Sequence, residues 1–112
     1  MIRRSQFAFA LLLALTAPAA AQERWTFCVG WASGVKDIWI SDVIAASDRE
    51  RLETAYKNYL EREGAAGVVA QCPKPSEDKT DVVNAQTSAE DFNRKLGATL
   101  HAVSAQDFPP RR

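Results

Sequence analysis

Few side chains of this sequence could do chemistry: two cysteines, Cys28 and Cys72, one histidine, His101, and three tryptophans. Two Cys and one His cannot complete a four-ligand zinc site without carboxylates, so we expect no metal and no cofactor. The imidazole of His101 could serve as a general base near neutral pH. However, neither G-x-S-x-G nor H-E-x-x-H occurs in the chain, and such motifs mark nucleophilic and zinc-dependent hydrolases. The residue types therefore favour a protein without catalysis and leave His101 as the one catalytic candidate.

The tryptophans suggest a binding surface. In an alternating strand, Trp39 shares a face with Ser41 and lies opposite the two isoleucines that flank it. An exposed Trp on a sheet face is a frequent anchor for a protein partner or a sugar. The other interpretation places Trp39 under the C-terminal tail, against Phe108, because a small domain needs its aromatic side chains in the core. The candidate binding residues are Trp39, Ser41 and His101.

Residues 1–21 have the layout of a secretory signal peptide. Arg3 and Arg4 supply a positive start, and Phe7–Leu15 is an unbroken apolar run. The segment ends in Ala19-x-Ala21, the small-residue pattern of a cleavage site. The apolar run is shorter than the roughly 20 residues that a membrane-spanning helix needs. We therefore expect cleavage after Ala21, no stable membrane anchor afterwards, and a periplasmic or secreted product.

Removal of the signal peptide changes the charge balance. The full chain has 14 basic and 14 acidic residues, and the loss of two arginines leaves a net charge of −2. This balance argues against a nucleic-acid partner. An even number of cysteines in an exported chain predicts a disulfide, here Cys28–Cys72, and no Cys-x-x-Cys redox motif competes with it. A loop of this size corresponds to about 4 kcal/mol of stabilisation in the chain-entropy model.

Hydrophobic periodicity predicts six elements in the order β-β-α-β-α-β. Strands alternate at 24–31 and 36–44, helices repeat at 48–63 and 77–96, and short strands follow at 66–71 and 98–103. Ser47 and Ser76 have the residue type of helix N-caps, and Gly64 stands where a helix ends. Thr87-Ser88 leaves open whether 77–96 is one helix or two.

These elements predict a single α+β domain over 22–104. We expect a small sheet with both helices packed on one face and one disulfide. Residues 105–112 are expected to form an extended tail, because Pro109 and Pro110 fix the backbone.

Three segments carry a resemblance to other proteins. Cys28 lies in the first strand, Ile38-Trp39-Ile40-Ser41-Asp42-Val43 forms the second, and Gln71-Cys72-Pro73 follows the first helix. In these features residues 24–104 resemble a group of small exported proteins of Gram-negative bacteria. The resemblance implies the fold, export and the disulfide, and it implies no activity. Ile44 stands where the group usually has Phe, and its frequent Trp near Ser104 is absent.

The sequence therefore favours a non-catalytic, disulfide-bonded module that binds a protein partner in the periplasm or the secreted fraction. One alternative is a structural protein of the cell envelope. The other is a small periplasmic enzyme that uses His101 together with a neighbouring carboxylate.

Overall fold

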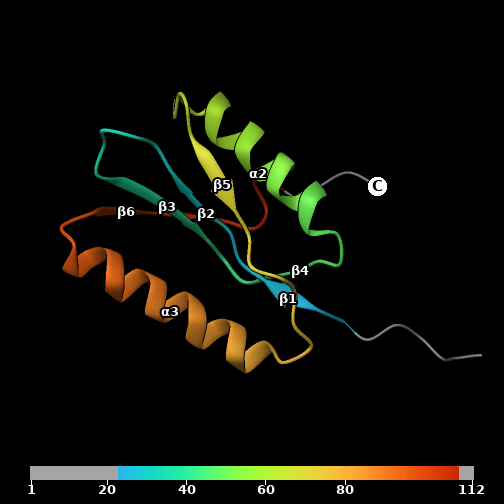
Figure 1. Ribbon diagram of the computed structural model, residues 1–112. Coiled ribbons are helices and arrows are strands. Elements are labelled where there is room, and N and C mark those ends of the chain that lie inside the picture. Colours follow the sequence, from blue (N-terminus) through green and yellow to red (C-terminus); the bar gives the residue numbers. More distant parts are fainter. Residues whose placement is uncertain (1–22, 109–112) are drawn as a thin grey trace, which may run out of the picture.

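The computed structural model of the protein describes residues 23–108 and has six strands and two helices in this range (Figure 1). The expected α+β class, the order of the elements and the Cys28–Cys72 disulfide are confirmed. With the labels of Figure 1, the elements are β1 (Trp25–Thr26), β2 (Val29–Trp31), β3 (Asp37–Ser41), β4 (Ile44–Ala45), α2 (Arg49–Arg62), β5 (Val69–Gln71), α3 (Lys79–Lys95) and β6 (Thr99–Val103).

A four-stranded mixed sheet in the order β5-β2-β3-β6 forms the centre of the molecule. Strands β2 and β3 make an antiparallel hairpin, β5 joins β2 antiparallel, and β6 joins β3 in parallel. A separate pair, β1 with β4, extends one end. The expected strand 24–31 is divided because Cys28 N–H donates to the Ser41 hydroxyl at 2.8 Å, where a continuous ladder would use a backbone carbonyl.

Both helices occur close to their expected bounds, and the segment 77–96 forms one helix through Thr87-Ser88. The caps are one or two residues later than expected. Asp48 accepts from Arg51 N–H, and Asp78 accepts from Asp81 N–H, each at 3.1 Å. A carboxylate at the N-cap satisfies an unpaired amide and also complements the helix dipole. This explains why the aspartates replace the expected serines as caps.

The helices pack on opposite faces of the sheet, and the expectation of a single covered face was wrong. Figure 1 shows α2 and α3 on either side of the four strands. Trp39 packs with the buried side chains of α2, whereas Ile38 and Ile40, its neighbours in β3, pack with those of α3. Successive side chains of a strand point to opposite faces. Because β3 is apolar on both faces, each face requires its own helix.

The larger core lies between the sheet and α2. Its buried members are Cys28, Leu52, Tyr56, Leu60, Ala65, Val68, Cys72, Val103 and Phe108. Phe27, Ile40 and Val82 form the smaller core under α3. The burial of Phe108 moves the end of the domain beyond the expected residue 104, because this ring lies edge-on to Tyr56 at 4.8 Å between centroids. The remaining expected tail, 109–112, lies outside the described residues.

Candidate functional site

The parallel pairing of β3 and β6 brings two of the predicted binding residues together. Trp39 and His101 are direct partners in this register. Their rings stack with centroids 5.4 Å apart and an interplanar angle of 20°. Residues 62 positions apart in the sequence thus form one aromatic pair on the α2 side of the sheet.

A carboxylate that the sequence analysis did not single out completes this pair. Asp37 Oδ1 lies 2.7 Å from His101 Nε2, and both side chains are less than half exposed. Asp37 shares the face of Trp39 because it lies two residues earlier in β3. Strand alternation was the only sequence signal that Asp37 shares a face with Trp39. The parallel register that places Asp37 beside His101 depends on the whole fold.

Ser41 lies on the same face but is structural. Its side chain is buried, accepts from Cys28 N–H and donates to the Asp42 carbonyl, with 2.8 Å for each bond. Both cysteines are held in the disulfide, so neither supplies a thiolate. The His101–Asp37 pair therefore has no serine or cysteine nucleophile among its hydrogen bonds in residues 23–108.

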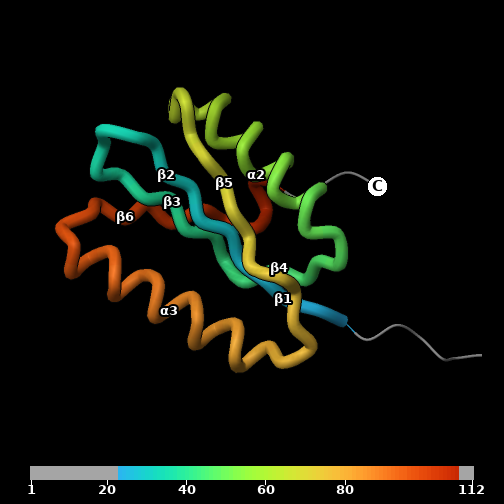
Figure 2. Tube along the Cα trace, viewed as in Figure 1, coloured from blue at the N-terminus to red at the C-terminus, as the bar shows by residue number. Residues whose placement is uncertain are grey.

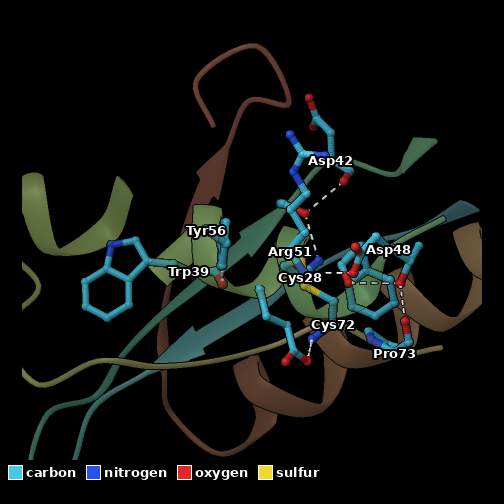
Figure 3. Close-up of a disulfide and its surroundings, with 12 residues drawn as sticks. Cys28, Trp39, Asp42, Asp48, Arg51, Tyr56, Cys72 and Pro73 are labelled. Atoms are coloured by element: carbon cyan, nitrogen blue, oxygen red, sulfur yellow. Dashed lines mark hydrogen bonds between the residues drawn. A yellow bond between two sulfur atoms is a disulfide. The ribbon is translucent and has the colours of Figure 1, made fainter. Parts of the chain in front are cut away.

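Trp39 is partly a core residue and partly exposed, so each of the two interpretations of the sequence holds in part. Its indole is half-buried against the larger core, the cluster that contains Phe108. Its carbonyl accepts a 2.8 Å hydrogen bond from the Tyr56 hydroxyl. In Figure 3 the indole extends away from the disulfide, toward one side of the molecule. The ring therefore contributes to packing and leaves part of its surface beside His101.

A groove of about 640 Å³ runs along the free edge of β5 and was not predicted. On the α3 side of the sheet, its floor consists of Val29 and Trp31 from β2 and Val69 and Gln71 from β5. Arg49 and Glu53 of α2 form the wall on the other side of the strand. The groove lies beside α3, which packs mainly over β1, β3 and β6 (Figure 2).

A second hollow of about 190 Å³ continues the groove. Pro73 lines both, and Phe27, Lys74, Asp81 and Ala85 are among the other residues around the second one. Here the wall opposite Pro73 is α3. The two hollows meet at Pro73, and we call them together the β5–α3 groove; their lining residues extend from Trp31 through Pro73 to Ala85.

Beyond the groove, α3 carries further exposed apolar side chains. Phe92 and the C-cap residue Leu96 follow at seven and eleven positions from Ala85, which is the spacing of one stripe on a helix. Their exposed fractions are 62% and 67%. Val69, on the floor, is 47% exposed. Exposed apolar side chains gathered at a concavity are typical of a site that another molecule covers.

The sequence could not indicate this groove. Phe92 and Leu96 fit the buried stripe of a helix, and β5 looks like any short strand. Only the packing of α3 against the sheet in the folded protein shows that Val69, Phe92 and Leu96 are exposed.

Among residues 23–108, no three His, Cys, Asp or Glu side chains gather where they could hold a metal ion. In the part of the chain that the structure describes, no helix has the length and apolar character of a membrane span.

Comparisons with known protein families, curated proteins and solved structures find no match.

Proposed function

We propose that this protein is an exported, non-catalytic module that binds an extended segment of a protein partner in the β5–α3 groove. The observation that carries the proposal is the groove over β2 and β5, with the apolar side chains of Trp31 and Val69 on its floor. Export is supported by the signal-like residues 1–21 and by the buried disulfide, since disulfides persist in oxidising compartments.

The chemistry of the groove favours a peptide with apolar side chains. Three of the four floor side chains, Val29, Trp31 and Val69, are apolar. Charges of both signs, Lys74 and Asp81, border the second hollow. Extended peptides place alternate side chains on one face, which suits a shallow groove with a flat floor. The groove favours this function over a purely structural role in the envelope, because a structural role does not require a concave apolar surface.

The test is selection from a random peptide library displayed on phage, followed by affinity measurements with the selected peptides. We expect apolar, alternating sequences to be enriched. Val69→Lys should weaken their binding about tenfold or more, since each 1.4 kcal/mol lost is a factor of ten. Val83→Lys is the matched control, because Val83 is similarly exposed at 39% but does not line the groove. Absence of enrichment, or equal losses in both variants, would overturn the proposal.

A further inference from the structure

We infer that two copies of this chain pair through their β5 edges and complete the β5–α3 groove between them. The inference rests on the proposed function, because it assigns the second wall of the same groove. In one copy, α3 borders the floor on one side only, and the opposite side is the free edge of β5.

Strand β5 is an outer strand with an unpaired edge. It pairs with β2 on one side and has no further strand on its other side among the described residues. Its sequence, Val69-Ala70-Gln71, contains neither the proline nor the lysine that proteins often place on an edge to prevent pairing. An antiparallel pairing of β5 with the same strand of a second copy would continue the sheet through a twofold axis near Ala70.

The charges of α2 fit such a pairing. Arg49, Glu53, Lys57 and Glu61 follow one another at intervals of four residues, which places them on one ridge of the helix with alternating signs. The first two line the groove at the β5 edge. In an antiparallel pair of α2 helices, Arg49 faces the second copy's Glu61, and Glu53 faces the second copy's Lys57. Every charge on the ridge thus meets the opposite sign, and the pattern is symmetric about Ala55.

The centre of this charge pattern agrees with the position of the strand. Glu53 Oε2 accepts from Cys72 N–H at 2.9 Å, just after β5, and Leu60 packs against Gly30, the β2 partner of Ala70. The part of α2 that lies over residues 70–72 therefore runs from Glu53 to Leu60. Residue 55 lies within this segment, so one twofold axis can serve both the strand pair and the helix pair.

The pairing has a consequence on the opposite face of the sheet. It doubles the four-stranded sheet and places the α3 helices of both copies along the two sides of a shared floor. A groove that is one-sided in the single copy becomes a two-walled site.

The oligomeric state tests the inference directly. We expect the exported protein to be a dimer in sedimentation equilibrium. Two double variants should each dissociate at least tenfold more readily: Arg49→Glu with Lys57→Glu makes the ridge acidic, and Glu53→Gln with Glu61→Lys makes it basic. The glutamine keeps an acceptor for Cys72 N–H. When mixed, the two variants should form a heterodimer, because their ridges are complementary.

The control reverses the same number of charges elsewhere. Lys36→Glu with Lys95→Glu changes two exposed lysines outside the α2 ridge and should leave the dimer intact. A monomeric wild type, or a dimer that resists both ridge variants, would overturn the inference. Peptide binding separates the two proposals. If ridge variants are monomeric yet bind selected peptides as the wild type does, the shared groove is wrong and the proposed function stands. If the wild type is a dimer but binds no peptide, the proposed function is wrong and the pairing through β5 stands.

Discussion

Gly30 is the residue that allows α2 to approach the sheet. A Cβ atom at this position would collide with the Leu60 side chain and lie 3.3 Å from Val68 Cγ2. Both neighbours are buried, so neither can move into open space. We expect Gly30→Ala to lower the free energy of unfolding by about 1–3 kcal/mol, as overpacked cores do. Urea denaturation followed by tryptophan fluorescence measures this loss.

A double variant separates overpacking from a general effect of alanine in a strand. Leu60→Ala removes the atom that collides and costs stability by leaving a cavity. Combined with Gly30→Ala, the new methyl group occupies part of that cavity. The total loss should therefore be smaller than the sum of the two single losses. Additive losses would show that close packing between Gly30 and Leu60 is not the cause.

Tyr56 gives the protein a dependence on alkaline pH. Burial raises the pKa of its hydroxyl above the ordinary value near 10, and Tyr59 nearby adds to the shift. The folded state therefore keeps the proton at a pH where the unfolded chain loses it. Stability is fully present below pH 10 and falls as the pH rises further, by up to about 1.4 kcal/mol per pH unit for one group. Unfolding in urea between pH 8 and 11, with the disulfide intact, measures the slope.

The matched variant is Tyr56→Phe. It removes the hydrogen bond to the Trp39 carbonyl and should cost about 1 kcal/mol at neutral pH. Above pH 10 its stability should decline less steeply than that of the wild type. The slope does not vanish, because desolvation, followed by the charge of Asp107, also raises the pKa of Tyr59. Equal slopes in both proteins would contradict the role of Tyr56.

At the scale of the elements, local patterns were sufficient for the helices. The helical repeat predicted over 48–63 corresponds to α2, whose buried residues are Leu52, Tyr56 and Leu60. The helix ends shifted because Asp48 competes with Ser47 for the same amides, and a charged acceptor forms the stronger bond. Strand existence was also predictable, but the division of the first strand depends on the Ser41 hydroxyl, which lies 13 residues from Cys28.

The arrangement of the elements contains the information that the sequence did not reveal. Parallel pairing of β6 with β3 brings His101 to Trp39 and Asp37, and no local signal fixes that register. The Ser41 side chain looked available on an alternating strand, yet it bonds within the core. Candidate residues could therefore be named from their types, whereas their accessibility required the fold.

For the whole molecule, size and layering set the stability. Two helices on opposite faces divide a limited number of apolar side chains between two cores, and among the described residues the α3 core has three buried members. A domain of this length buries a modest fraction of its surface. The disulfide connects residues 44 positions apart and joins the strand region to the segment after β5. It therefore ties together parts of the larger core that are distant in sequence.

We expect loss of this disulfide to destabilise the protein strongly. Restricting the unfolded chain over this separation is worth about 4 kcal/mol in the chain-entropy model. In a domain of fewer than 100 residues, each kcal/mol shifts the melting temperature by several degrees, so the loss should lower it by roughly 15–30 °C. Calorimetry of the oxidised protein and of a Cys28→Ala, Cys72→Ala variant measures the difference.

The oxidised protein should also resist reductant while it is folded. Cys28 and Cys72 are 0% and 2% exposed, so a thiolate reaches the bond only after the larger core opens. Reduction should therefore be slow in buffer and fast in denaturing urea, with thiol release followed by a colorimetric reagent. The same rate in both conditions would show that the bond is accessible in the folded state. An unchanged melting temperature in the double alanine variant would show that the larger core holds together without the covalent link.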